Sequence, residues 1–139
     1  MAMNYSWNWG VLLQPTGVGN EVYWQWLLTG FKWLLVIGGS GWLIALIIGT
    51  ILGIMRTLPN KTARAIGTAY VSFFRNIPLL IQLFFWFYVA PTWLTPALQK
   101  WWFQELDPNT SAVISASLGL GLFTAARIAE QVRTGIESL

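Results

Sequence analysis

Residues 73–87 read FFRNIPLLIQLFFWF, an apolar run interrupted by four residues that a lipid bilayer disfavours: Arg75, Asn76, Pro78 and Gln82. A charged side chain inside a membrane helix costs free energy, about 2.5 to 3.5 kcal/mol for a central arginine, so such residues usually face protein or water. We therefore expect the three polar side chains to point away from lipid and the proline to interrupt or kink a helix.

The composition around this stretch is that of a membrane protein. Of the 139 residues, 55% are hydrophobic and 9% are charged, whereas about a quarter are charged in ordinary soluble domains. Three windows contain no charged residue and are long enough to cross a bilayer as helices: residues 33–55, 76–99 and 108–126. Several tryptophans lie where these windows meet their flanks, as expected for rings that favour the headgroup layer. The sequence predicts an all-α transmembrane protein with three membrane-spanning helices.

The residues that are missing exclude several classes of chemistry. The chain has no histidine and no cysteine, which removes disulfides, thiolate nucleophiles, the common zinc sites and any Ser-His-Asp triad. Its five acidic residues form no pair inside a predicted span, as two-carboxylate catalysis would require. No basic patch with stacking aromatic residues suggests nucleic-acid binding. We expect no enzyme activity, no metal, no cofactor and no nucleic-acid partner.

Charge asymmetry predicts the topology. The segment between the first two windows carries Arg56, Lys61, Arg64 and Arg75 and no acid, and short basic loops stay in the cytoplasm. The expected organisation begins with an outer tail at 1–20, an outer interfacial helix plus the first transmembrane helix at 21–56, and a cytoplasmic loop with an interfacial helix at 57–74. It continues with the second transmembrane helix at 75–97, an outer loop at 98–107, the third transmembrane helix at 108–132 and the start of a cytoplasmic loop at 133–139.

The second span can begin in two ways. Asn76 can cap a new helix with Pro78 in its first turn, which leaves residues 63–74 as a separate interfacial helix. Alternatively, one helix runs from residue 65 to 89 and is kinked at Pro78, so that Gln82 can satisfy the carbonyl that the proline leaves free. We favour the kinked continuous helix. In either case Arg75, Asn76 and Pro78 are interpreted as hinge and scaffold residues.

Two patterns concern the packing of helices. Gly41, Ala45, Gly49 and Gly53 recur every four residues, and small side chains at this spacing let a second helix approach closely in lipid. The third helix should begin with Asp107 as its cap and Pro108 at its first position. Its small and hydroxyl residues suit burial among other helices better than contact with lipid.

A charged stripe follows at the end of the third helix. Arg127, Glu130, Arg133 and Glu137 are spaced by three, three and four residues, so they lie on one face of the helix. One interpretation is a solvated face on an emerging helix. The other is that Arg127 lines a cavity and offers its guanidinium to a carboxylate. Glu130 would then hold Arg127 in place or receive an ammonium group, and Gln82 is a weaker candidate for the lining.

Two long motifs, YVSFFRNIPLLIQLFFWF at 70–87 and GLGLFTAARIAEQVRTGIESL at 119–139, resemble the membrane subunits of bacterial ABC importers for polar amino acids. The likeness is close to permeases of the glutamate/aspartate system, and NWGVLLQ, GIMRTLPN and ELDPN support it. It implies a type I importer fold and a second permease subunit. It also implies cytoplasmic ATP-binding subunits, a periplasmic substrate-binding protein and a lipid bilayer as the surroundings. On this resemblance the membrane is the bacterial inner membrane, the outer tail at 1–20 and the outer loop at 98–107 are periplasmic, and the coupling loop begins at 133–139.

The resemblance implies import of acidic L-amino acids driven by ATP, and no phosphate-binding loop of the G-x-x-x-x-G-K-[ST] type occurs in this chain. Such permeases have about five spans with a coupling loop after the third, so the chain is expected to be the N-terminal portion of one. Many relatives that bind other amino acids carry an aromatic residue at the position of Arg127, which fits an acidic substrate here. The alternatives are an importer of other polar amino acids and a non-transporting membrane anchor that assembles a complex.

Overall fold

The computed structural model describes residues 6–139, and these residues are helical except for turns, short connections and one isolated bridge between Pro15 and Val22. Residues 1–5 lie outside the description, so the tail predicted at 1–20 can be followed only from residue 6. The chain divides into two compact units, residues 1–35 and 36–139, and each is described by itself. The helix α1 (Tyr23–Thr57) begins in the first unit and ends in the second.

The first unit contains more structure than an irregular tail. The 3-10 helix η1 (Trp9–Leu13) is capped by Asn8, whose side chain accepts a hydrogen bond from the Gly10 amide. The chain then turns through Gly17 and Gly19, whose φ angles of 78° and 61° lie in the left-handed region that favours glycine. At the start of α1 the Trp26 indole donates a hydrogen bond of 2.6 Å to the Glu21 carboxylate.

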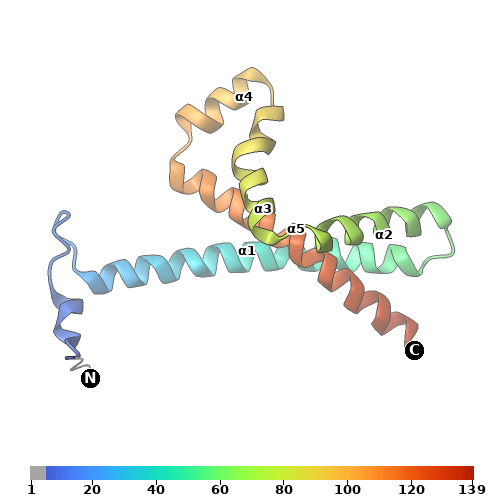
Figure 1. The fold of residues 1–139 in the computed structure, drawn as a ribbon, viewed down its shortest axis with the longest axis horizontal. Helices are drawn as coiled ribbons and strands as arrows, with labels where there is room; N and C mark the ends of the chain where they lie inside the picture. Colours follow the sequence, from blue (N-terminus) through green and yellow to red (C-terminus); the bar gives the residue numbers. More distant parts are fainter. Residues whose placement is uncertain (1–5) are drawn as a thin grey trace, which may run out of the picture. The chain divides into compact units, whose positions relative to one another are not determined.

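The second unit holds the rest of α1 and the helices that follow it (Figure 1). These are α2 (Lys61–Asn76), α3 (Leu79–Phe84), the π-helix η2 (Phe85–Val89), the 3-10 helix η3 (Ala90–Trp93), α4 (Pro96–Lys100), the π-helix η4 (Trp101–Glu105) and α5 (Pro108–Glu137). The segment predicted as a periplasmic loop at 98–107 therefore contains part of α4 and all of η4. Residues 133–137, predicted as the start of a loop, continue α5.

Local capping explains where the two helices α2 and α5 begin. The Asn60 side chain accepts hydrogen bonds from the amides of Thr62 and Ala63, and so satisfies donors that a helix start leaves free. The Asp107 side chain accepts one from the Thr110 amide, and Pro108 occupies the first turn, where its missing N–H costs little. Both features of α5 agree with the sequence prediction.

Within residues 6–139, two helices, α1 and α5, are long and apolar enough to cross a membrane, and a bent pair of helices raises the number to three if it forms one span. The pair consists of α2 and residues 79–93, which meet at an angle of 102°. The prediction of one kinked helix through Pro78 was therefore wrong. Ile77 is extended, with ψ of 124°, because a proline disfavours helical backbone in the residue before it. Asn76 ends α2 and does not cap α3, whose N-cap is Pro78.

The four small residues repeated along α1 are buried, and α5 lies against them. A Cβ atom added to Gly49 would lie 2.7 Å from Ile128 Cβ and 2.8 Å from the Ala125 carbonyl oxygen. One added to Gly53 would lie 2.6 Å from Val132 Cβ. These distances are shorter than van der Waals contact, so the two helices approach as closely as they do because glycine has no side chain.

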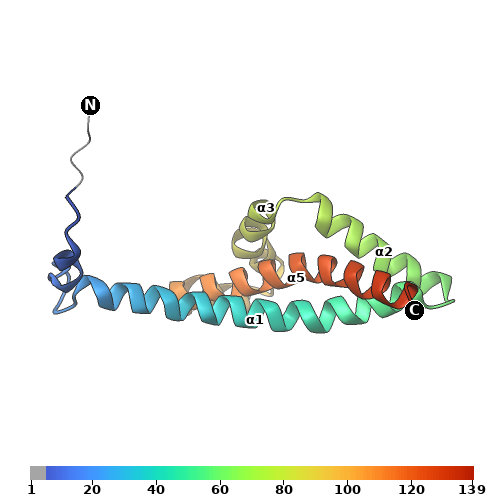
Figure 2. The same ribbon diagram turned by 90° about the horizontal axis from the view of Figure 1, so that it is seen from below.

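The core of this unit lies where α1, α2 and α5 meet, and Figure 2 shows α5 beside the later part of α1. Leu52, Val71, Ala126 and Ala129 form its buried centre. The buried residues of α5 are all small, being serine, glycine or alanine. Many large apolar side chains on α1 and α3, such as Ile47 and Leu80, are exposed instead. Small residues inside and large ones outside are the arrangement expected when the solvent is lipid.

Candidate functional site

An ion-pair network joins α1 to the later part of α5. The Glu130 carboxylate accepts hydrogen bonds of 2.5 Å from Arg56 of α1 and of 2.5 Å from Arg133 of α5. Arg133 also pairs with Glu137 one turn further on. The side chains of Arg56, Glu130 and Arg133 are only 12%, 29% and 25% exposed. Each carboxylate oxygen of Glu130 therefore accepts a hydrogen bond from an arginine. Arg133 belongs to the same helix, and Arg56 belongs to α1.

Close packing of α2 explains why Arg56 reaches Glu130. A Cβ atom added to Gly67 of α2 would lie 2.6 Å from Arg56 Cγ, so the aliphatic part of Arg56 lies directly against the backbone of α2. One interpretation of the sequence expected Glu130 to pair with Arg127. The structure shows no such pair. Within a single helix the i, i+3 spacing allows Glu130 to pair with Arg127 or Arg133. Arg56 of α1 lines one cavity with Arg133 and Glu137, and it also lines a cavity with Arg75 and Glu130.

Arg127 is left without a polar partner. Its side chain is exposed, and no hydrogen bond or ion pair to it occurs among residues 6–139. Its guanidinium lies over the Phe123 ring, 5.0 Å from the ring centroid, which is a cation–π contact. This contact uses none of the guanidinium's N–H donors for a hydrogen bond. Arg127 is therefore held by the helix it belongs to and is free to bind an anion.

The cavity beside Arg127 is polar and open. It has a volume of about 400 Å³ and is lined by Arg75, Phe123, Arg127, Glu130 and Gln131. A second cavity, of about 330 Å³, shares Arg75 and Glu130 with the first and extends along α2 past Ser72 and Asn76. We call these two cavities together the arginine groove. Its volume lies in the range of small-molecule sites, about 300 to 1,000 Å³.

The sequence predicted Arg127 and Glu130 as lining residues, and both line the arginine groove, although they form no ion pair with each other. The structure also brings Arg75 and Asn76 to the arginine groove, although the sequence suggested only hinge and scaffold roles for them. The basic character of the segment before Pro78 was visible in the sequence. What the sequence could not show is that α2 packs on α5 so that its last turn faces Arg127.

Gln82 lies elsewhere. Its side chain is 4% exposed, and its amide nitrogen donates to the carbonyl oxygens of Phe74, at 3.1 Å, and of Ile77, at 2.9 Å. These carbonyls belong to the end of α2 and to the break before Pro78, so Gln82 fills the positions that the interrupted helix leaves without donors. This agrees with the expectation that Gln82 satisfies a carbonyl that Pro78 leaves free. Gln82 does not line the arginine groove but borders a small apolar cavity of about 120 Å³.

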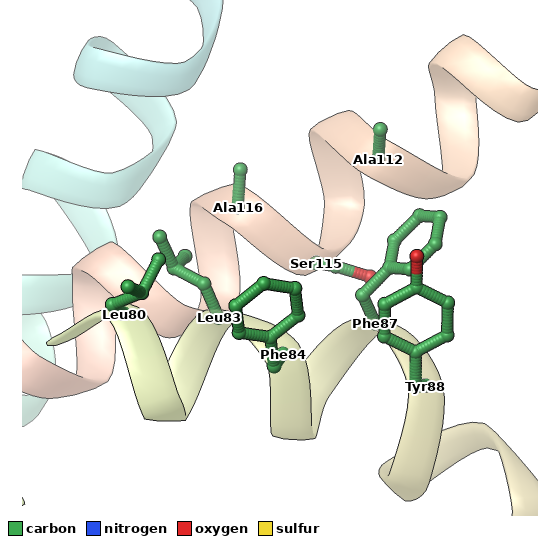
Figure 3. Close-up of a pocket in the computed structure, with 8 residues that line it drawn as sticks. All are labelled: Leu80, Leu83, Phe84, Phe87, Tyr88, Ala112, Ser115 and Ala116. Carbon is green, nitrogen blue, oxygen red and sulfur yellow. The ribbon is translucent and has the colours of Figure 1, made fainter.

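Another cavity, of about 250 Å³, lies between α5 and the segment formed by α3 and η2 (Figure 3). Leu80, Leu83, Phe84, Phe87 and Tyr88 stand on one side of it, and Ala112, Ser115 and Ala116 belong to α5 on the other. The Ser115 hydroxyl donates to the Trp86 carbonyl at 3.3 Å. No charged side chain lines this cavity, so it offers no partner for a carboxylate or an ammonium group. Residues 6–139 also contain no group of three or more Asp, Glu, His or Cys side chains that could hold a metal ion.

Comparison with known proteins identifies homologues of the chain. It is 44% identical over 137 residues to the glutamate/aspartate import permease protein GltJ of Escherichia coli K12. The match covers 99% of this chain and 56% of that protein. It is 32% identical to the glutamate/aspartate import permease protein GltK of Escherichia coli O157:H7, over 81% of this chain and 48% of that protein. The arginine transport system permease protein ArgU of Corynebacterium glutamicum is 31% identical, over 70% of this chain and 31% of ArgU.

No protein-family model matches the chain, and no solved structure matches it. The chain spans about half the length of the curated relatives it matches. The described residues contain two or three candidate spans, and the relatives are permeases, so the chain is a multi-pass membrane protein. The chain is therefore a homologue of the bacterial glutamate/aspartate import permeases, matched over about half of their length.

Proposed function

We propose that the chain is part of a permease subunit of an ATP-driven importer for acidic L-amino acids, glutamate and aspartate, in the bacterial inner membrane. The observation that carries this proposal is the 44% identity to GltJ along 99% of the chain. The geometry of the arginine groove agrees with it, because an exposed guanidinium without a polar partner is suited to bind a carboxylate.

Within this proposal Arg127 binds the side-chain carboxylate of the substrate. The Phe123 ring lies beside the Arg127 guanidinium and leaves the N–H donors available to the carboxylate. Glu130 is held by Arg56 and Arg133 and contributes the negative charge at the edge of the groove, where a substrate ammonium would lie. Gln82 acts through the helix break that it stabilises rather than by contact with substrate, since it lies outside the groove.

The partners follow from the proposed assembly. A second permease subunit completes the pathway, cytoplasmic ATP-binding subunits supply energy, and a periplasmic substrate-binding protein delivers the amino acid. The basic residues between α1 and the bend at Pro78 favour an orientation with this segment in the cytoplasm and residue 1 in the periplasm. Transport then requires two states of the helices that differ in their affinity for substrate, with ATP hydrolysis on the partners shifting the balance. The chain itself acts as a transport component and not as an enzyme.

The test is uptake of radiolabelled L-glutamate by proteoliposomes that contain the complete importer. We expect Arg127→Gln to abolish most of the uptake while the complex still assembles, as judged by size-exclusion chromatography. Arg64→Gln, a change of the same kind outside the groove, should leave uptake near the wild-type rate. Failure of the wild-type complex to take up L-glutamate or L-aspartate would refute the proposal.

Two further candidates have their own observations. Relatives named for arginine and glutamine transport, at 31% and 33% identity, favour an importer for other polar amino acids. Competition of labelled glutamate uptake by unlabelled glutamate, arginine and glutamine separates this candidate from the first. A non-transporting anchor draws support from the close packing of α1 and α5. For such an anchor, Arg127→Gln either impairs assembly of the complex or has no effect. In complexes that do assemble, the substitution leaves uptake unaltered.

A further inference from the structure

Arg75 and Arg127 share a property that sets them apart from the other arginines of residues 6–139. Arg56 and Arg133 pair with Glu130, and Arg64 donates to the Leu58 carbonyl. Neither Arg75 nor Arg127 has a hydrogen bond or an ion pair in the described part of the chain. Both side chains are exposed, and both line the same cavity of about 400 Å³.

The two arginines come from different helices that are packed together. Arg75 lies in the last turn of α2, and Arg127 lies on α5 opposite it. Each is therefore fixed by a regular element, and the break at Ile77 and Pro78 ends α2 directly after Arg75. Two guanidinium groups that face one cavity, with no hydrogen bond or ion pair among residues 6–139, favour anionic groups between them. The arrangement thus has a built-in preference for a ligand with two negative groups.

The third charge of the cavity supports a more specific ligand. Two guanidinium groups and the Glu130 carboxylate line it. An acidic amino acid carries the opposite set of charges, two carboxylates and one ammonium group. Because Glu130 is already held by Arg56 and Arg133, it cannot turn to neutralise Arg75 or Arg127 without breaking those pairs. Both free arginines therefore remain available to the ligand.

We infer that Arg75 is the second carboxylate ligand of this site and binds the α-carboxylate of the amino acid, while Arg127 binds the side-chain carboxylate. The inference rests on the proposed function and adds to it a residue and a division of labour. Arg127 then determines the preference for acidic side chains. Arg75 recognises the group that every amino acid shares, so its removal weakens binding without changing that preference.

The experiment measures equilibrium binding to the purified permease assembly, in detergent and without the substrate-binding protein. Three probes are compared: L-glutamate, L-glutamine, which lacks the side-chain carboxylate, and 4-aminobutyrate, which lacks the α-carboxylate. Losing one charge-assisted bidentate contact should weaken binding about 10- to 100-fold. For Arg75→Gln we expect this loss for L-glutamate and L-glutamine alike and no change for 4-aminobutyrate. For Arg127→Gln we expect the loss for L-glutamate and 4-aminobutyrate and little change for L-glutamine.

Arg75→Lys and Arg64→Gln serve as controls. The lysine keeps the charge but loses the planar fork, so it should restore part of the affinity, and Arg64→Gln should bind all three probes as the wild type does. Thermal unfolding of each variant shows whether it is folded. The inference is overturned if folded Arg75→Gln binds L-glutamate normally, if it loses 4-aminobutyrate as strongly as L-glutamate, or if the wild-type assembly binds none of the probes.

The outcomes also separate this inference from the proposed function. Normal glutamate uptake by the Arg75→Gln importer, together with loss of uptake in Arg127→Gln, would leave the proposed function intact and overturn the role of Arg75. If Arg75→Gln instead loses only the retention of phosphatidylglycerol during purification, the residue binds lipid headgroups and the inference is wrong. Absence of glutamate and aspartate uptake by the wild-type importer would refute the proposed function itself.

Discussion

Arg56 of α1 and Glu130 of α5 form an ion pair with an N–O distance of 2.5 Å, although 74 residues separate them in the sequence. Glu130 pairs with Arg56 and Arg133 and not with Arg127, although Glu130 and Arg127 line the same cavity. The availability of the proposed substrate-binding arginine therefore depends on which arginines Glu130 pairs with.

Replacing Glu130 by glutamine should destabilise the fold. The change keeps the shape of the side chain but leaves Arg56, whose side chain is 12% exposed, without a charged partner. Hydrogen bonds to charged groups contribute about 1.5 to 3 kcal/mol, so we expect a loss of about 2 kcal/mol in the free energy of unfolding. Thermal unfolding in detergent, followed by circular dichroism, measures it. Glu137→Gln is the control, because that carboxylate is 51% exposed and should cost about 0.5 kcal/mol or less. Equal losses for both variants would contradict the prediction.

A methyl group at Gly49 should separate α1 from α5. The Cβ atom of Gly49→Ala would meet both the Ile128 side chain and the Ala125 carbonyl at less than 3 Å, and backbone cannot move aside at low cost. Overpacking of this kind costs about 1 to 3 kcal/mol. Gly38→Ala, the same change in the same helix, has no neighbour within 4 Å and should be neutral or slightly stabilising because alanine favours helix. A Gly49→Ala protein that melts at the same temperature as Gly38→Ala would show that the close approach is not required.

Gln82→Leu should weaken the break between α2 and α3. Two backbone carbonyls, those of Phe74 and Ile77, would lose their donor in a place that the buried Gln82 side chain now fills. Leaving such groups unpaired costs about 1 to 3 kcal/mol, so the melting temperature should fall. The matched control is Gln99→Leu, because Gln99 also donates to two carbonyls, those of Thr92 and Leu94. Those bonds are exposed, so water can replace the amide and the melting temperature should change little. A larger effect at Gln99 than at Gln82 would contradict this account.

The hydroxyls of Ser40 and Ser117 should couple α1 to α5. Ser40 Oγ and Ser117 Oγ are 2.7 Å apart, and the Ser40 hydroxyl also lies within hydrogen-bond distance of carbonyls in its own helix. A double-mutant cycle with alanine at both positions should give a coupling free energy of about 0.6 kcal/mol, the size usual for such bonds between membrane helices. The same cycle with Ser40 and Ser111 should give none, because Ser111 donates to the Pro108 carbonyl of its own helix. Equal coupling in both cycles would show that the Ser40–Ser117 bond contributes nothing specific.

Particular residues show how far sequence reasoning reached. The start of α5 at Asp107 and Pro108 was predictable because a cap and a proline act within one turn of chain. The sequence does not decide the geometry at Pro78, because proline permits either a kink or a break, and the favoured kinked helix is not the one that forms. A buried amide, Gln82, bonds to carbonyls on both sides of Ile77 and favours the break. The sequence could indicate that Gln82 donates a hydrogen bond to a free carbonyl. It could not indicate that α2 ends at Asn76.

What the sequence by itself determined is that this chain forms long apolar helices with small residues at regular intervals. In lipid, backbone groups must bond locally, so the length and polarity of a segment are enough to predict its structure. Only the tertiary structure decided that Arg56 forms an ion pair with Glu130 and that Arg75 and Arg127 line one groove. Those relationships depend on how closely α1, α2 and α5 pack, and the packing distance is set by side chains far apart in the chain, such as Gly53 with Val132 and Gly67 with Arg56.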